Sequence, residues 1–318
     1  AGLSAALHLS LANQELESDQ QFEIVVRERK RFLGGRAGSY MDSQGEQLID
    51  FCQHVSMGCC TWFQDFCEKG GVDHCFKPVS RLHFFLPQGK PIRFEASSYL
   101  PAPFHLALSL VRHRHLSIAE RFSIARTLMR LAQYKKDEDI VALEWLLEQG
   151  QTDRCIRQFW ETFLLSALGE RIERVSLIAA RKVVVDGFLR NRKGYQVRIP
   201  TKSLRQLFDR DVAQNLKRRG IKLERSCPNH RLSISQQGVL MHGENTAENG
   251  FAKVVCAVPW HSLNDLLTPP LSQQLPELAG VNEFRASPIT GIHLWFDRPI
   301  TDLPHAVFVG RTSHWLFN

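Results

Sequence analysis

Several features that define other protein classes are missing from the sequence. No apolar run approaches the roughly 20 residues that a membrane-spanning helix requires, so no transmembrane helix is predicted. No internal repeat is visible. Hydrophobic residues make up 43% and charged residues 23%, as in ordinary globular proteins, which excludes a disordered chain, a coiled coil and a collagen-like repeat. The 318 residues suffice for about two domains.

Signals for export and for a structural zinc site are missing as well. The chain begins without a secretory signal or an initiating Met, so the 8 cysteines are interpreted as reduced thiols of a cytoplasmic protein. No CxxC pair occurs. A zinc module is the alternative, but buried thiols are the favoured interpretation and no metal is predicted. The residues that such a module would use are Cys60, Cys67, His74 and Cys75.

Acidic residues are fewer than basic ones, 33 against 40, which gives a net charge of 40 − 33 = +7. This charge suits a phosphate-bearing ligand, an anionic membrane or nucleic acid. Because the basic residues are scattered along the chain, we predict no nucleic-acid partner.

Half of a dinucleotide-binding motif opens the chain. A helix is predicted from Ala1 with the small residue Gly2 in its first turn, followed by an apolar strand at residues 22–26 and then Glu28. This order, with 20-odd residues between glycine and acid, is typical of the second half of a βαβ unit whose acid accepts ribose hydroxyl hydrogen bonds. The first strand and the first two glycines of GxGxxG are absent.

A glycine pair follows the acid at a short interval. Gly34 and Gly35 allow a ligand to approach backbone that no Cβ covers, and Arg36 offers a planar fork of donors suited to a pyrophosphate. A solvated basic turn is the alternative. The combined order of helix, strand, acid and Gly-Gly-Arg is a much more specific signal of dinucleotide binding than either half alone.

These residues resemble the flavin-containing amine oxidase and phytoene desaturase superfamily. Within it, the segment at residues 49–60 is similar to the Asp-x-Gly-Gln-His-x-x-x-Gly segment of hydroxysqualene dehydroxylase, also called squalene-associated FAD-dependent desaturase. Three further segments, at residues 159–168, 287–297 and 315–318, resemble that family in the same order. Cys52 and Thr162 depart from its usual Gly and Pro. Compared with the family, the chain is a fragment that lacks both ends.

The resemblance implies an α/β fold, a Rossmann-like FAD-binding domain without its first strand, interleaved with an α+β substrate domain. Residues 1–78 and 194–265 would form the FAD domain, and residues 79–193 and 266–318 the substrate domain, with the last residues beginning a return to the FAD domain. Elements are also expected from the residues themselves: a hairpin at 81–94 around a Pro-Gln-Gly turn, a capping box at Ser117, a helix at 201–217, an alternating strand at 221–224 and a buried strand at 253–259.

The resemblance also implies the cofactor and its ligands. FAD would contact the turn glycines and the acid of the βαβ unit, and the residue after the strand at 221–224 would meet the adenine, for which Cys227 is the nearest match; a loop thiol is the alternative there. The predicted cofactor residues are Gly2, Glu28, Gly34, Gly35, Arg36 and Cys227.

The implied reaction is the reductive removal of the hydroxyl of hydroxysqualene to give squalene, which needs a proton donor and a dry apolar tunnel. His54 is the candidate donor, Asp50 would orient it or bind the flavin, and Gln53 would bond the flavin ring. A packing histidine is the alternative for His54. Trp160, Phe163 and Leu164 are candidate tunnel residues, with a core role as the alternative.

The implied partners are an apolar isoprenoid and the partner enzymes of squalene synthesis. The basic and apolar stretch at residues 106–116 could rest on the inner face of a membrane or form a core helix with a solvated face. A desaturase or amine oxidase of the same fold is the nearest rival function. A non-catalytic fragment is the rival of another class, because a doubly wound sheet without its central strand exposes unpaired edges.

Overall fold

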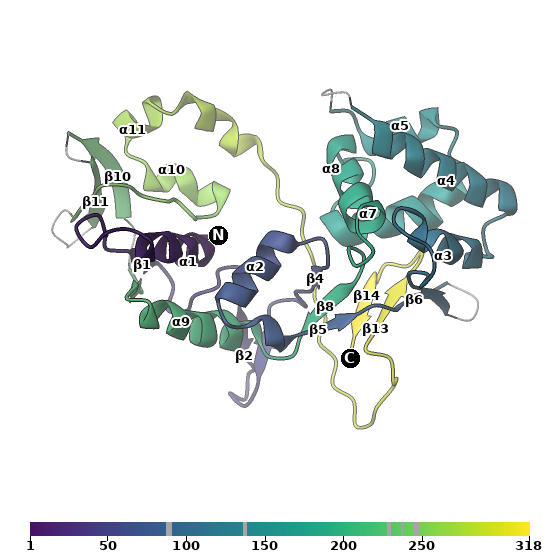
Figure 1. The fold of residues 1–318 in the computed structure, drawn as a ribbon, viewed down its shortest axis with the longest axis horizontal. Helices are drawn as coiled ribbons and strands as arrows, with labels where there is room; N and C mark the ends of the chain where they lie inside the picture. The colour runs from purple at the N-terminus through teal and green to yellow at the C-terminus, as the bar shows by residue number, and fades with distance from the viewer. Residues whose placement is uncertain (87–90, 136–138, 228–229, 237, 244–248) are drawn as a thin grey trace. The chain divides into compact units, whose positions relative to one another are not determined.

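The computed structural model describes residues 1–86, 91–135, 139–227, 230–236, 238–243 and 249–318, and these form two compact units (Figure 1). Unit 1 comprises residues 1–51, 62–75 and 201–286. Unit 2 comprises residues 52–61, 76–200 and 287–318. Helices and strands occur in both units, as the predicted α/β class requires. The predicted division into FAD and substrate domains concerns ligands and stays a prediction.

Unit 1 is built around a parallel strand pair, β1 with β9, in which Val25 lies opposite Lys222 and Glu28 opposite Arg225. Helix α1 packs on β1 (Figure 1), and helix α9 packs on β9. Strands β2 and β3 form an antiparallel hairpin, and β10, β11 and β12 form an antiparallel sheet. The elements of unit 1 are α1 (Gly2–Gln14), β1 (Val25–Glu28), β2 (Ser39–Met41), β3 (Leu48–Asp50), α2 (Thr61–Lys69), η1 (Asp73–Cys75), η5 (Gln206–Val212), α9 (Ala213–Arg218), β9 (Lys222–Arg225), β10 (His230–Ser235), β11 (Gly238–Gly243), β12 (Asn249–Phe251), η6 (Trp260–Ser262), α10 (Leu263–Leu266), α11 (Pro269–Gln273) and η7 (Pro276–Glu283).

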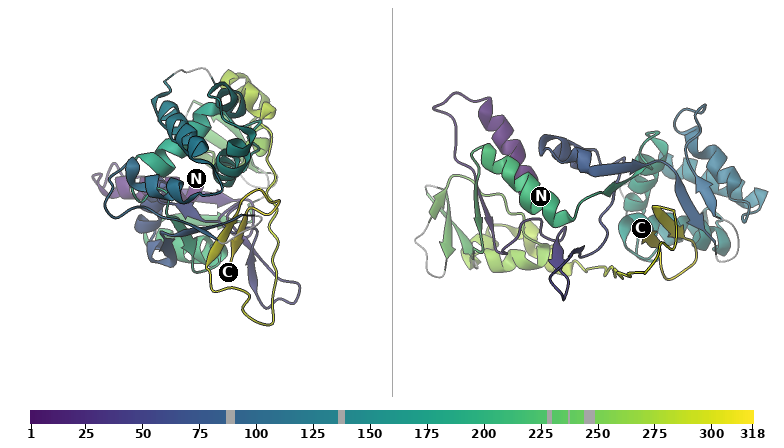
Figure 2. Two further views of the ribbon diagram at one scale, coloured as in Figure 1. Left: turned by 90° about the vertical axis from the view of Figure 1, so that its right-hand side faces the viewer. Right: turned by 90° about the horizontal axis from the view of Figure 1, so that it is seen from below.

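Unit 2 combines a helical layer with two small sheets. The sheets have the orders β14-β13-β6-β7 and β4-β8-β5, and the helices from α3 to α8 gather together in both views of Figure 2. The elements of unit 2 are β4 (Ser56–Met57), β5 (Phe76–Val79), β6 (Leu82–Phe85), β7 (Ile92–Phe94), η2 (Phe104–Leu106), α3 (Ala107–Arg112), α4 (Ile118–Gln133), α5 (Ala142–Glu148), α6 (Asp153–Cys155), η3 (Ile156–Trp160), α7 (Glu161–Leu168), α8 (Leu177–Lys182), η4 (Val183–Leu189), β8 (Val197–Pro200), β13 (His305–Phe308) and β14 (Trp315–Phe317).

Most predicted elements form close to their expected positions. The opening helix is α1, the strand after it begins at Val25 and includes Glu28, and the strand expected at 221–224 is β9. Gly220 ends the preceding helix with a φ of +80°, a conformation that glycine adopts without strain. In unit 2, Ser117 and Glu120 form the predicted capping box at the start of α4.

The hairpin expected at residues 81–94 is β6 with β7, paired antiparallel from Leu82 opposite Phe94. Its predicted Pro-Gln-Gly turn lies outside the described residues. The sequence pattern predicts this strand pairing correctly because side chains alternate between the two faces of a strand. Leu82, Phe84 and Phe94 therefore share the buried face of the sheet.

The buried strand expected at residues 253–259 is a wrong prediction. The segment is irregular and its side chains are mostly exposed, including Val255 and Val258. Apolar composition supplies strand propensity, but a strand also needs a neighbour to accept and donate its backbone hydrogen bonds. Neither β1 nor β9 pairs with this segment among the described residues.

No helix in the described part of the chain combines the length and the apolar character that crossing a bilayer requires.

Candidate functional site

The carboxyl ends of β1 and β9 meet at one edge of unit 1. Glu28 ends β1, and its main-chain oxygen accepts a hydrogen bond from the amide of Cys227 at 3.0 Å. The Glu28 carboxylate, partly exposed, accepts the amide N–H of Lys30 at 2.8 Å, which holds the side chain at this edge. Ligands of parallel α/β sheets bind outside the carboxyl ends of the strands, and Glu28 and Cys227 lie at such an edge. Their predicted contacts with a nucleotide stay a prediction.

A glycine turn follows this edge. Gly34 and Gly35 adopt φ values of +109° and +61°, and a Cβ on Gly34 would meet the main-chain oxygen of Ala37 at 2.6 Å. No atom of a described residue lies within 4 Å of where a Cβ of Gly35 would stand, and Arg36 is exposed. The turn therefore presents open backbone and a free guanidinium, an arrangement that fits a pyrophosphate group.

Asp209 on η5 anchors this turn, and sequence reasoning missed it. Its Oδ1 accepts the amide N–H of Leu33 at 2.8 Å and lies 3.0 Å from Nη1 of Arg225. Its main-chain oxygen accepts a second bond from Arg225. The carboxylate thereby fixes the start of the glycine turn to the end of β9. No local signal could have found it, because Leu33 and Asp209 are 176 residues apart in sequence.

Gly2 lies at the start of α1. A Cβ built there would stand 3.3 Å from the Cβ of Ala257, closer than ordinary contact. A small residue is therefore required for this approach of α1 to the segment at 253–259, and a cofactor role for Gly2 stays a prediction.

Asp50 holds a different part of unit 1 together. Its Oδ1 accepts bonds from Oγ of Ser39 at 2.6 Å and from the amide of Leu204 at 3.0 Å, while Oγ of Ser39 accepts the amide of Arg205 at 2.9 Å. These bonds join the β2–β3 hairpin to the first amides of the helix that contains η5. The catalytic role predicted for Asp50 stays a prediction.

His54 and Gln53 belong to unit 2. Nδ1 of His54 lies 2.9 Å from the main-chain oxygen of Cys52, so this nitrogen carries a proton and donates it. Nε2 is then an acceptor in the neutral ring and a donor only in the imidazolium form. Gln53 is exposed. Their predicted catalytic roles are not tested by these contacts.

The three predicted tunnel residues lie in the apolar core of unit 2. Trp160 and Leu164 are each 1% exposed, and Nε1 of Trp160 donates to Oε1 of Gln151 at 2.8 Å. Phe163 packs against the rings of Phe159 and Phe188, with ring centroids 4.8 and 5.1 Å away. Trp160 and Leu164 belong to the buried cluster of this core and Phe163 is partly buried against it, as their alternative core role predicts, and their role toward a substrate stays a prediction.

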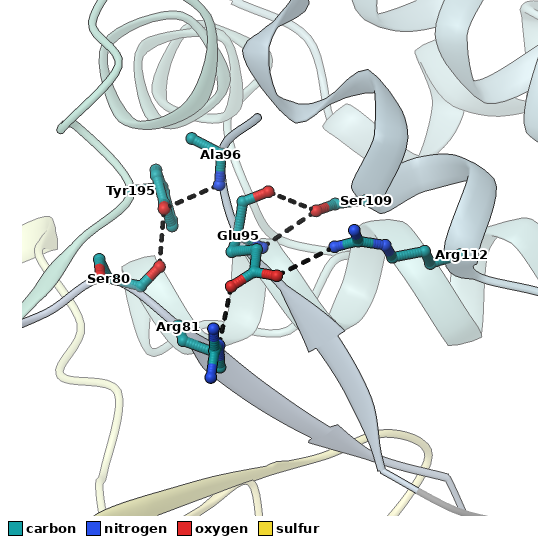
Figure 3. Close-up of polar contacts among 7 residues, drawn as sticks. All are labelled: Ser80, Arg81, Glu95, Ala96, Ser109, Arg112 and Tyr195. Carbon is teal, nitrogen blue, oxygen red and sulfur yellow. Dashed lines mark hydrogen bonds and ion pairs between the residues drawn. The ribbon is translucent and has the colours of Figure 1, made fainter. Parts of the chain in front are cut away.

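A polar cluster missed by sequence reasoning surrounds Glu95, which follows β7 (Figure 3). Its carboxylate pairs with Arg81 at 2.7 Å and Arg112 at 3.2 Å, and the Arg81 guanidinium lowers the pKa of this carboxyl. The hydroxyl of Tyr195 donates to the main-chain oxygen of Ser80 at 2.6 Å. The cluster borders a cavity of about 340 Å³ and ties the β6–β7 hairpin to α3.

No group of three or more metal-ligating side chains comes together within the described ranges, including the cysteines and histidine of the alternative zinc site.

Comparison with known proteins places these features in context. The family described as flavin containing amine oxidoreductase matches residues 1–316. A zeta-carotene desaturase from Zea mays is 26% identical over 175 residues, which are 51% of this chain and 29% of that protein. A 15-cis-phytoene desaturase from Synechococcus elongatus is 22% identical over 325 residues, which are 97% and 66% of the two chains.

Solved structures show the same fold. The structure of an oxidoreductase from Methanosarcina mazei is similar with a TM-score of 0.60 at 14% identity, over 89% of this chain and 63% of that chain. The chain thus spans less than two thirds of each of these three proteins.

Proposed function

The chain belongs to the flavin-containing amine oxidoreductase family, and on that premise we propose that it is an FAD-dependent oxidoreductase acting on a long, apolar isoprenoid. The observation that carries the proposal is the edge of unit 1, where the Glu28 carboxylate ends β1 and the open backbone of Gly35 lies in the turn that follows. Glu28 would accept the ribose hydroxyls, and Gly34, Gly35 and Arg36 would bind the pyrophosphate. Bound FAD would supply hydride chemistry.

The reaction we propose first is the reductive removal of the hydroxyl of hydroxysqualene. The support is the resemblance of four segments of the sequence, including the one that holds Asp50, Gln53 and His54. In this reaction a carbon–oxygen bond breaks, the hydroxyl leaves as water, and a hydride and a proton are consumed. A residue of the chain must hold that proton.

His54 is the proposed proton donor. Its Nδ1–H bond to the main-chain oxygen of Cys52 fixes the ring orientation and leaves Nε2 to give the proton from the imidazolium form. Exchange of His54 for Ala is expected to abolish turnover with FAD binding near normal. Loss of FAD from this variant would instead assign the residue to cofactor packing.

Desaturation of a polyene is the second candidate reaction. It is favoured by the curated relatives, which are zeta-carotene and phytoene desaturases at 19–26% identity. Both reactions require an apolar isoprenoid and differ in the direction in which electrons move between substrate and cofactor.

Product analysis separates the two reactions. The full-length protein is purified, its visible spectrum recorded, and the dithionite-reduced enzyme incubated with hydroxysqualene; the oxidised enzyme is incubated with phytoene. Squalene from the first incubation supports dehydroxylation, and a more conjugated polyene from the second supports desaturation. A protein without flavin absorbance would contradict the cofactor proposal and favour a non-catalytic role.

A matched pair of glycines tests the cofactor site. Gly35 and Gly45 both lie in unit 1 with positive φ, +61° and +76°, and no described residue comes within 4 Å of where a Cβ of either would stand. Alanine costs each about the same backbone strain, roughly 1 kcal/mol. We expect Gly35→Ala to lower the flavin content of the purified protein at least tenfold and Gly45→Ala to preserve it. Equal flavin content in the two variants would remove the glycine turn from the site.

A further inference from the structure

Large apolar side chains are exposed on the outer faces of α3, α4 and the residues directly before α3. Ile118 is 79% exposed and Phe122 is 72% exposed, and Phe104, Val111 and Leu108 are between 45% and 58% exposed. We call these five residues the α3–α4 face. Single exposed apolar residues are ordinary, but five large ones between residues 104 and 122 exceed that pattern, and exposed apolar patches are typical of interaction sites.

The spacing of these residues places them away from the core. Phe104, Leu108 and Val111 follow one another at intervals of four and three, while Ser109 and His113 on the other side of α3 are buried. Ile118 and Phe122 are four residues apart on α4, and Ile124 and Leu131 of the same helix are buried in the core of unit 2. Each helix therefore already buries one side, polar in α3 and largely apolar in α4, and presents an apolar side outward.

A hydrogen bond joins the two helices at this face. Nη1 of Arg121, in the first turn of α4, donates to the main-chain oxygen of Val111 at the end of α3 at 2.6 Å. The end of α3 thus lies against the beginning of α4, where Ile118 and Phe122 stand. The two helices appear next to each other in Figure 1.

The charge around the face is positive. Between residues 93 and 130 the chain has six arginines and two glutamates. Glu95 is paired with Arg81 and Arg112, and the carboxylate of Glu120 accepts the amide N–H of Ser117 in the capping box. Arg114 and Arg126 are exposed and form no ion pair with another described residue. The acidic groups are thus engaged within unit 2, while free guanidinium groups border the apolar face.

We propose that the α3–α4 face docks on the surface of an anionic lipid bilayer. Apolar side chains would enter the boundary between headgroups and acyl chains, and Arg114 and Arg126 would meet lipid phosphates. Short helices with an outward apolar side and cationic borders bind such interfaces through the sum of buried apolar area and attraction to anionic lipid. The proposal concerns binding to a surface and does not depend on the proposed catalytic function.

The chain offers a matched control in a second exposed apolar segment of unit 2. Ile292 is 76% exposed and Leu294 is 70% exposed in an irregular stretch of residues 289–296. Replacement of Ile118 and Phe122, or of Ile292 and Leu294, by serine removes exposed apolar surface and creates no cavity in the core. The variants Ile118→Ser/Phe122→Ser and Ile292→Ser/Leu294→Ser therefore compare two sites with the same kind of change.

The test is flotation of the full-length protein with vesicles. Wild type is expected to float with phosphatidylcholine vesicles that contain phosphatidylglycerol and to bind pure phosphatidylcholine vesicles at least tenfold more weakly. Because burial of one large apolar side chain changes partitioning by roughly tenfold, Ile118→Ser/Phe122→Ser should lower binding to the anionic vesicles at least tenfold. Ile292→Ser/Leu294→Ser should bind like wild type. Arg114→Gln/Arg126→Gln should lose most of the preference for anionic vesicles.

Other outcomes overturn the proposal. Equal binding of wild type and Ile118→Ser/Phe122→Ser, or loss of binding only in the 292/294 variant, would exclude the α3–α4 face. Absence of vesicle binding would also exclude it. If wild type then sediments as a dimer that Ile118→Ser/Phe122→Ser converts to a monomer, the face is an interface between two copies.

Discussion

The two units fix their functional segments by different physical means. In unit 1, the glycine turn and the β2–β3 hairpin are held by the carboxylates of Asp209 and Asp50, which accept main-chain amides far away in sequence. In unit 2, aromatic rings fill the core, and His113 and His305 lie among them at most 1% exposed with both ring nitrogens unbonded to other described residues.

This difference predicts which substitutions and which pH changes destabilise each unit. An open loop has little apolar surface to bury, so a few charge-assisted hydrogen bonds must set its shape, and the loss of one carboxylate is costly. A packed aromatic core distributes its contacts widely, but a neutral histidine inside it is stable only while it remains unprotonated. Unit 1 should therefore be sensitive to single substitutions of its anchors, and unit 2 to acid.

The largest effect is expected in unit 1 from Asp209→Ala. The substitution removes the carboxylate that accepts the amide of Leu33 and pairs with Nη1 of Arg225, which keeps only its bond to the main-chain oxygen of residue 209. This loss should cost about 3 kcal/mol of unfolding free energy. Urea unfolding of the purified protein, monitored by far-ultraviolet circular dichroism, measures this loss of unfolding free energy. Flavin content should fall in parallel, since the glycine turn loses its anchor.

Asp211 on the same helix is the matched control for Asp209. Its partners Lys202 and Arg210 are substantially exposed, so Asp211→Ala should cost about 1 kcal/mol or less. Equal losses in the two variants would show that any carboxylate of this helix stabilises unit 1 and that the glycine turn has no special anchor.

An intermediate effect is expected in unit 2 on acidification. Burial, with His115 and Arg121 nearby, lowers the pKa of His113 from 6.5 to about 4. The unfolded chain takes up this proton first, so the contribution to stability is complete above pH 6.5 and is lost as the pH falls toward 4. By pH 5 the loss from His113 alone is about 2 kcal/mol.

Replacement of His113 by Phe removes this titration. Unfolding free energies measured at pH 7 and pH 5 should differ by about 2 kcal/mol less in His113→Phe than in wild type. His293→Phe, at an exposed position, should keep the wild-type difference. Burial also lowers the pKa of His305 to about 4. His305 is present in all three proteins and contributes equally to their pH dependence. The same pH dependence in all three would contradict the assignment to His113.

The smallest effect compares a thiol from each unit. A hydrogen bond from Cys59 lowers the pKa of the neighbouring exposed thiol, Cys60, to about 6, whereas partial burial raises the pKa of Cys256 above its usual 9.0. At pH 6 about half of Cys60 would be thiolate, against less than about one in a thousand of Cys256. The weaker nucleophilicity of the more acidic thiol offsets part of this difference and leaves a rate ratio of about tenfold or more.

Peptide mass spectrometry after timed iodoacetamide labelling gives both rates in one sample. Cys59→Ala removes the S–H donor and should bring the rate at Cys60 close to that at Cys256. An unchanged rate at Cys60 in this variant would show that Cys59 does not stabilise its thiolate.

Local features of the sequence were sufficient for much of the fold. The Ser117 capping box, the Gly220 helix end and the β6–β7 alternation are decided by residues within a few positions of one another, and each was predicted. The order of helix, strand, acid and glycine turn in unit 1 is local as well, and α1 and β1 form with Gly34 and Gly35 in the turn that follows.

What could not be predicted depends on partners distant in sequence. The apolar segment at 253–259 has the composition of a buried strand but no hydrogen-bonded neighbour among the described strands. Asp209 is one acidic residue among many until the fold brings it to the amide of Leu33. Likewise, the sequence pattern at residues 106–116 could not distinguish a core helix from a helix that rests on a membrane surface, because α3 buries one side and exposes the other.

Because the two units are interleaved in sequence, segments of each unit are synthesised at separate times. The chain passes from one unit to the other five times, after residues 51, 61, 75, 200 and 286. Arg27 of β1 finds its partner Glu224 on β9 197 residues later. At about 5–20 residues per second, β1 leaves the ribosome on the order of 10–40 s before the strand it pairs with exists. During that interval β1 has no partner strand. Because each unit consists of three separate segments, no cut between two consecutive residues releases either unit whole.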